Sequence, residues 1–119
     1  MKRNKTIEHR IEMDIIPDAH DREEQLMGWY YYFECKMVGP FKAKCIIKRV
    51  TSPLEVGEVV EVLSLASEND CHHEILVNIL WGGRKLAIPL VQLKGIGVAP
   101  DIKEAINDWH YWAGMEYEF

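Results

Sequence analysis

The chain has 119 residues, of which 48 % are hydrophobic and 28 % charged, and its formal net charge is -5. This length and composition predict a single globular domain over residues 1–119 and exclude an intrinsically disordered chain. An acidic balance favours cations or basic partners, and it argues against a nucleic-acid partner held by a basic surface.

The cysteine count and the hydropathy pattern indicate the cellular compartment of the protein. Three cysteines, Cys35, Cys45 and Cys71, are too few and odd in number for a disulfide framework, which favours reduced thiols in a cytosol. No apolar run in the sequence is long enough for a secretory signal or a membrane span. We therefore expect a cytoplasmic location and no membrane partner.

The first part of the chain predicts a strand and then a helix. Residues 1–9 are polar and are expected to be disordered, and residues 10–16 alternate apolar and polar side chains, which predicts a half-buried strand. Asp21 and Glu24 have the spacing of a helix capping box. The helix body over 26–33 is aromatic on nearly all sides, which predicts that neighbours cover it, although the same aromatics would also suit a strand.

A β-rich block follows Gly39-Pro40. Strands are expected over residues 41–50, 59–65, 74–81 and 84–91, with Gly82-Gly83 as a tight hairpin turn. Pro89 cannot donate a ladder hydrogen bond, so it should lie at an edge, a strand end or a bulge. This strand spacing predicts a small antiparallel SH3-like sheet or barrel.

The last element is a helix that begins at Pro100-Asp101. Asp101 and Glu104 form a second capping box, and Gly114 is expected to end the helix. Its core-facing positions recur at helical spacing: Ile102, Ala105, Ile106, Trp109 and Trp112. The predicted fold is therefore α+β, a small antiparallel SH3-like sheet or barrel packed with an N-terminal helix and a C-terminal helix.

Two groups of side chains suggest metal binding. Five carboxylates within eleven residues offer the oxygen ligands that Ca²⁺ prefers, although helix capping also explains them: Asp14, Asp18, Asp21, Glu23 and Glu24. No EF-hand loop pattern occurs. Cys71, His72 and His73 suggest zinc as a lesser possibility, because adjacent strand residues point to opposite faces and at most two would face one ion.

The sequence offers little support for an enzyme. It contains no phosphate-binding loop, no dinucleotide fingerprint and no nucleophile elbow. Asp108 and His110 are two residues apart on the predicted helix and so do not face each other. We therefore predict a protein without catalytic residues and without an organic cofactor.

The chain resembles the small calcium-binding proteins of the CcbP type, a family defined in heterocyst-forming cyanobacteria. The resemblance covers roughly residues 10–119 and is carried by these strings: 10–16 RIEMDII, 18–20 DAH, 28–34 GWYYYFE, 40–45 PFKAKC, 60–63 VEVL, 81–90 WGGRKLAIPL and 108–112 DWHYW. It implies a compact α+β protein that binds Ca²⁺ without EF-hands and buffers it in the cytosol. It also implies acidic ligands near Glu34 and in the loop with Glu68 and Asp70.

From the acidic cluster and the resemblance together, we predict calcium ligation by the carboxylates of five residues: Asp18, Asp21, Glu24, Glu34 and Asp108. Cys35 follows Glu34, and a thiol is a poor ligand for a hard cation. The thiol beside Glu34 and the predicted strands over residues 41–91 together leave open an alternative. In that alternative the chain is a non-metal SH3-like interaction module with an unidentified protein partner.

Overall fold

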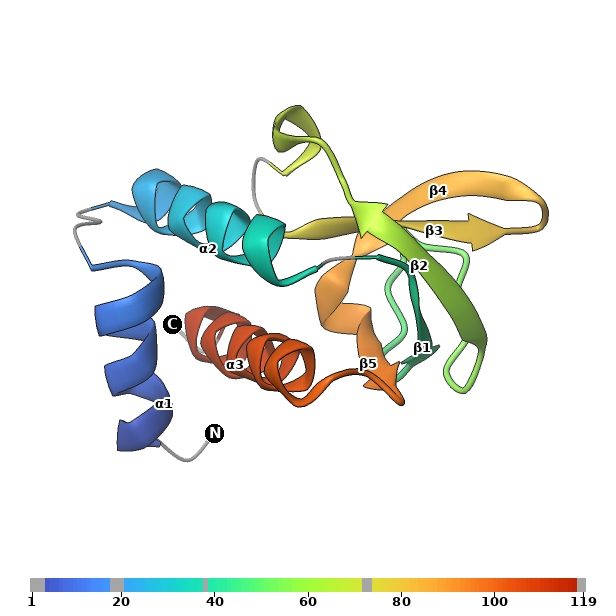
Figure 1. Cartoon of the computed structure of the whole chain (residues 1–119). Helices are drawn as coiled ribbons and strands as arrows, with labels where there is room; N and C mark the ends of the chain where they lie inside the picture. The colour runs from blue at the N-terminus through green and yellow to red at the C-terminus, as the bar shows by residue number, and fades with distance from the viewer. Residues whose placement is uncertain (1–3, 18–20, 38, 72–73, 118–119) are drawn as a thin grey trace.

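The computed structural model describes residues 4–17, 21–37, 39–71 and 74–117. Its helices are α1 (Lys5–Arg10), the π-helix η1 (Ile11–Ile15), α2 (Arg22–Lys36), the short 3-10 helices η2 (Glu68–Asp70) and η3 (Leu90–Gln92), and α3 (Pro100–Tyr117). Its strands are β1 (Phe41–Cys45), β2 (Val59–Leu65), β3 (Leu76–Trp81), β4 (Arg84–Pro89) and β5 (Leu93–Ile96). Figure 1 shows α2 and α3 side by side at one end of the sheet, with α1 beside them.

The five strands form one sheet in the order β4-β3-β2-β1-β5, with antiparallel neighbours throughout. Gly82 and Gly83 have φ of 59° and 78°, the left-handed values that a tight hairpin needs, so this predicted turn is confirmed. Pro89 ends the edge strand β4, where its missing N–H leaves no gap in a ladder. The predicted α+β class with an antiparallel sheet is confirmed, and the SH3-like character stays a prediction.

The strand predicted over residues 10–16 is wrong, and so is the expected disorder of the described residues among 1–9. The chain is helical from Lys5 to Ile15, and the Asn4 side chain caps its first turn by accepting the N–H of Ile7. Ile11 and Ile15 are buried, whereas Met13 is 60 % exposed. Residues four apart share a helix face, so the period-2 pattern of isoleucines also fits a helix.

Some predicted boundaries also differ from the structure. β1 ends at Cys45 rather than at residue 50, β3 begins at Leu76 and β4 ends at Pro89. β5 was not predicted, and it has only four residues. Gly114 does not end α3, because it does not have the positive φ of a helix-terminating glycine and the helix continues to Tyr117.

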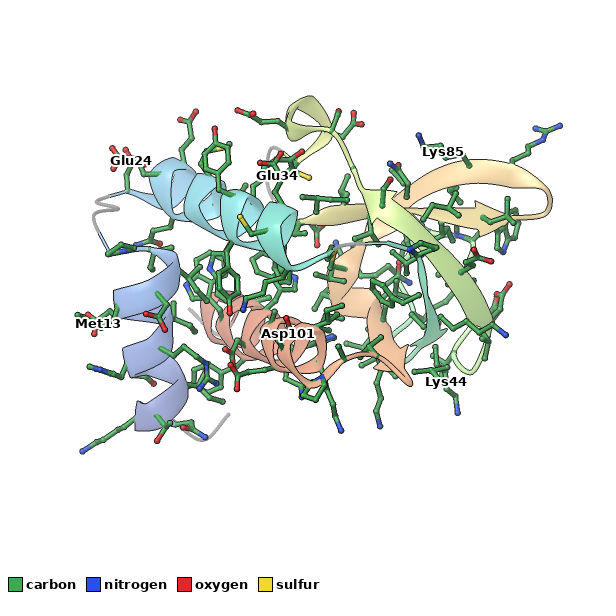
Figure 2. All side chains as sticks on the ribbon, in the orientation of Figure 1. Met13, Glu24, Glu34, Lys44, Lys85 and Asp101 are labelled. Carbon is green, nitrogen blue, oxygen red and sulfur yellow. The ribbon has the colours of Figure 1, made fainter. Side chains whose placement is uncertain are left out.

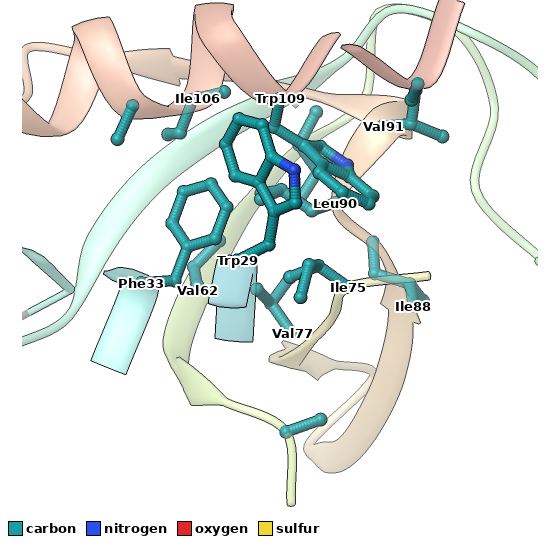
Figure 3. Close-up of a cluster of buried hydrophobic side chains, with 14 of the residues drawn as sticks. Trp29, Phe33, Val62, Ile75, Val77, Ile88, Leu90, Val91, Ile106 and Trp109 are labelled. Atoms are coloured by element: carbon teal, nitrogen blue, oxygen red, sulfur yellow. The ribbon is translucent and has the colours of Figure 1, made fainter. Parts of the chain in front are cut away.

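The helix predicted from the first capping box is confirmed. Oδ1 of Asp21 accepts the backbone N–H of Glu24 at 2.8 Å, and α2 runs on to Lys36. Its aromatic residues enter the core shown in Figure 3, where Trp29 and Phe33 lie beside Trp109 of α3. The ring centroids of Trp29 and Trp109 are 5.3 Å apart at an interplanar angle of 73°. Edge-to-face contact of this kind is the favoured geometry of buried aromatic pairs.

The N-terminal helices are fastened to α3 by polar contacts. Arg10 donates two hydrogen bonds to Asp108, from Nε to Oδ2 at 2.7 Å and from Nη2 to Oδ1 at 2.8 Å. The Tyr111 hydroxyl accepts the backbone N–H of Asn4 at 2.7 Å and donates to the Glu8 carboxylate. These bonds hold α1 and η1 against α3.

Gly28 permits close packing between α2 and η1. A Cβ at this position would lie 2.7 Å from the carbonyl oxygen of Ile15 and 3.0 Å from Cγ2 of Ile16. We expect Gly28→Ala to lower the free energy of unfolding by about 1–3 kcal/mol through overpacking, despite a gain of about 1 kcal/mol in helix propensity. Urea denaturation measures the change. A stabilised variant would contradict the packing shown here.

His110 should make stability depend on pH. Its Nε2 lies 2.7 Å from the Leu93 carbonyl oxygen and so carries the proton, and burial lowers the pKa of the ring below its usual value. The unfolded chain then binds a proton more readily than the folded protein, so the free energy of unfolding should fall as pH drops below about 6.5. Urea denaturation between pH 7.5 and pH 5 tests this.

The matched variants are His110→Gln and His9→Gln, the second at an exposed position on α1. We expect His110→Gln to flatten the dependence of unfolding free energy on pH, and His9→Gln to leave it as in the wild type. If the slope is the same in all three proteins, another group causes the dependence.

Candidate functional site

The structure separates the carboxylates that were predicted to share a calcium ion. Asp21 and Glu24 lie at the N-terminal end of α2, Glu34 lies near its C-terminal end, and Asp108 lies in α3. Figure 2 shows Glu24 and Glu34 toward opposite ends of α2. A ten-residue separation along a helix is about 15 Å, so one ion cannot bind both. Asp18 lies outside the described residues.

The N-terminal end of α2 borders a pocket of about 530 Å³. Its acidic lining consists of Asp21, Glu23 and Glu24, and its apolar lining includes Ile16 and Met27. One oxygen of Asp21 already caps the helix. The positive end of the helix dipole points into this region and opposes the binding of a cation. The pocket therefore offers carboxylate oxygens that suit calcium, but the electrostatic field of the α2 dipole opposes the ion there.

Asp108 already has a cationic partner. The residue is 1 % exposed, and both of its carboxylate oxygens accept hydrogen bonds from Arg10. Glu104 lies 3.5 Å from Nε of the same guanidinium. A calcium ion at Asp108 would have to displace this arginine. Sequence reasoning missed Arg10 because 98 positions separate it from Asp108, and no local pattern links two such residues.

The C-terminal half of α2 is joined to the segment that leads into η2. The Tyr30 hydroxyl donates to the carbonyl oxygen of Ala66 at 2.9 Å, and both residues are buried. Burial raises the pKa of Tyr30 above its usual value, and the negative charges of Cys71, Glu34 and Glu68 raise it further. Carboxylates from two elements, α2 and η2, therefore act on the same phenol.

The electrostatic field at this end suits a cation. The last carbonyls of α2 form the negative end of the helix dipole. Glu34 and Glu68 are exposed, and Asp70 is exposed with one carboxylate oxygen accepting the Ser67 hydroxyl at 2.9 Å. Lys36 lies over the ring of Tyr32, with its ammonium 5.4 Å from the ring centroid. Since Glu34 is two residues from Lys36, the two side chains leave the helix on different faces.

The predicted zinc ligands are only partly described. Cys71 is buried, which raises the pKa of its thiol, whereas His72 and His73 lie outside the described residues. Cys45 is also buried and Cys35 is exposed. Within the described part of the chain, no three Asp, Glu, His or Cys side chains already converge closely enough to hold a metal ion. In the same residues, no helix has the length and apolar character needed to cross a membrane.

Comparisons with known proteins agree on one family. The sequence model of the CcbP family, described as "Calcium binding", matches residues 9–113. The crystal structure of Anabaena CcbP is 38 % identical, with a TM-score of 0.81 over 95 % of this chain and 93 % of that one. A structure described as "Calcium binding protein in the calcium-binding form" is 37 % identical, with a TM-score of 0.84 over 98 % and 96 % of the two chains.

No curated protein has a sequence that matches this one. The family match nevertheless covers far more than half of the chain, and the two solved structures share its fold from end to end. The family is defined by calcium binding and not by a reaction. The chain belongs to the CcbP family of calcium-binding proteins.

Proposed function

We propose that the chain binds Ca²⁺ at the C-terminal end of α2, through the carboxylates of Glu34, Glu68 and Asp70, and that it buffers calcium in the cytosol. The observation that carries the proposal is the Tyr30–Ala66 hydrogen bond. It fastens α2, one helical turn before Glu34, beside the segment that bears Glu68 and Asp70.

The donor chemistry fits calcium. Ca²⁺ takes six to eight oxygen ligands in a flexible geometry, and carboxylates bind it through one oxygen or two. Three exposed carboxylates supply up to six oxygens, and backbone carbonyls and water complete the shell. Because the described carboxylates do not already converge, the ion would draw the side chains of α2 and η2 together. Such a site suits reversible buffering, since part of the binding energy is used to order its ligands.

The remaining predicted ligands have other assignments in this proposal. Asp21 and Glu24 form a secondary acidic site whose affinity is lowered by the positive end of the α2 dipole, and Asp18 stays a ligand predicted from the sequence alone. Asp108 serves to hold the N-terminal helices through Arg10. The non-metal module is the weaker alternative, because the family match favours calcium.

Calcium titration by isothermal calorimetry on metal-stripped protein tests the site. We expect Glu34→Gln and Glu68→Gln each to weaken calcium binding about tenfold or more, because each removes a charged ligand. A tenfold loss corresponds to about 1.4 kcal/mol. Glu12→Gln is the matched control, since it removes the same charge from an exposed position on η1 and should bind as the wild type does.

Two outcomes would contradict the proposal. If Asp21→Asn or Glu24→Gln causes the large loss and Glu34→Gln does not, the ion binds at the N-terminal end of α2. If the wild type gives no heat at millimolar Ca²⁺, the chain has lost the activity of its family.

Asp108→Asn distinguishes a structural role from a ligand role. Breaking a buried ion pair leaves Arg10 without its anion, so we expect the free energy of unfolding to fall by about 3 kcal/mol. Urea denaturation should show the same loss in chelator and in calcium. A loss that appears only in calcium would instead identify Asp108 as a ligand.

A further inference from the structure

Three lysines gather on the outer face of the sheet, where β1 and β5 pair. We call this surface the basic sheet face, and it consists of Lys42, Lys44 and Lys94 with the apolar side chains of Val59 and Ile96. Along β1, Ala43 and Cys45 are fully buried and Lys42 and Lys44 are exposed. Along β5, Leu93 is buried and Lys94 is exposed. The alternation places all three lysines on the side away from the core.

The strand register brings these side chains together. Lys44 is directly opposite Lys94 on one side and Val59 on the other, and Lys42 is opposite Ile96. Cβ atoms of directly opposed residues are about 4.5–5.5 Å apart. Like charges at this spacing repel, so Lys44 and Lys94 weaken the pairing of the strands that carry them. The fold itself therefore offers no reason for this pair.

None of the three lysines forms an ion pair with a carboxylate in the described part of the chain. Other basic residues do: Lys48 lies 2.8 Å from Glu55, and Arg49 lies 2.9 Å from Glu74. Glu61 is opposite Lys42 in the register but forms no ion pair with it. Glu61 lies on this same face and offsets part of its charge, whereas the opposed pair Lys44 and Lys94 has no carboxylate directly opposite it in the register.

The face also exposes apolar surface. Val59 is 55 % exposed and Ile96 is 42 % exposed, and Leu80 of β3, opposite Glu61, is 46 % exposed. An anion alone would use the lysines but not these side chains. A ligand that alternates acidic and apolar groups would use both.

We propose that the basic sheet face binds an acidic segment of a partner protein in which aspartate or glutamate alternates with large apolar residues. Charge complementarity selects the acidic groups, and Val59 and Ile96 contact the apolar ones. A nucleic acid fits less well, because the face has no arginine and no aromatic ring for base stacking, and the rest of the chain is acidic. This inference does not depend on the calcium site.

Fluorescence anisotropy with a labelled twelve-residue peptide of alternating glutamate and leucine tests the proposal. We expect the peptide to bind the wild type, and the triple variant Lys42→Gln, Lys44→Gln, Lys94→Gln to bind it at least tenfold more weakly. Raising the salt from 50 to 300 mM should weaken wild-type binding, because screening reduces exposed charge interactions. Lys5→Gln is the matched control, since it removes the same charge from an exposed position on α1, outside the sheet, and should bind the peptide as the wild type does.

A second measurement separates recognition from folding. Lys94→Glu puts a carboxylate opposite Lys44, so it should raise Tm while it weakens peptide binding. Loss of binding with raised Tm supports the proposal, and a folded Lys94→Glu variant that binds as the wild type does overturns it.

Three other results would also overturn the proposal. The first is no binding of the peptide to the wild type at millimolar concentration. The second is tighter binding of a twelve-nucleotide single-stranded RNA than of the peptide, which would assign a nucleic acid to the face. The third is ultracentrifugation in which the wild type dimerises and the triple variant does not, which would assign a second copy of the chain.

Discussion

The contact between Trp29 and Trp109 packs the middle of α2 against α3. Both indoles are almost completely buried, and neither indole N–H has a hydrogen-bond partner within the described residues. The contact is therefore one of shape and apolar area, with ring centroids 5.3 Å apart. α2 is a rod of 15 residues, and beside Trp29 its residue Gly28 lies against Ile15 of η1 while Tyr30 bonds to Ala66, just before η2. The two acidic regions of the protein are products of that placement.

Polar contacts add to the aromatic core in holding the helices in place. Arg10 reaches Asp108 from a helix that has little buried area of its own, and the Tyr111 hydroxyl takes up the free N–H of Asn4. At the other end, Tyr30 contributes its ring to the core and its hydroxyl to Ala66. Buried tyrosines commonly act in this way, since one end is apolar and the other needs a partner. Trp29 and Phe33 thus serve as core, and Tyr30 serves both as core and as a connector.

Patterns among residues close in sequence correctly predicted several elements of the fold. The capping box at Asp21 and Glu24, the glycine pair at 82–83 and the stripe of residues 102–112 each depend on neighbours in sequence, and each was confirmed. Residues 10–16 were predicted as a strand, but Ile11 and Ile15 also fit one face of a helix, and η1 packs against α2 at Gly28. The joining of Arg10 to Asp108 and of Tyr30 to Ala66 depends on tertiary structure. Neither segment alone contains a sequence pattern that predicts its partner.

The net charge of -5 is a sum over surface regions of opposite charge. Carboxylates at the ends of α2 are in part required for capping, and the remaining ones are available to a cation. The lysines of β1 and β5 lie on an opposed strand pair where no such structural role exists. At physiological ionic strength, exposed charges interact over about 8 Å, so each surface acts on a ligand mainly through its own nearest side chains. The proposed calcium site uses carboxylates of α2 and η2, and the proposed basic sheet face uses lysines of β1 and β5, so the two proposals depend on different residues.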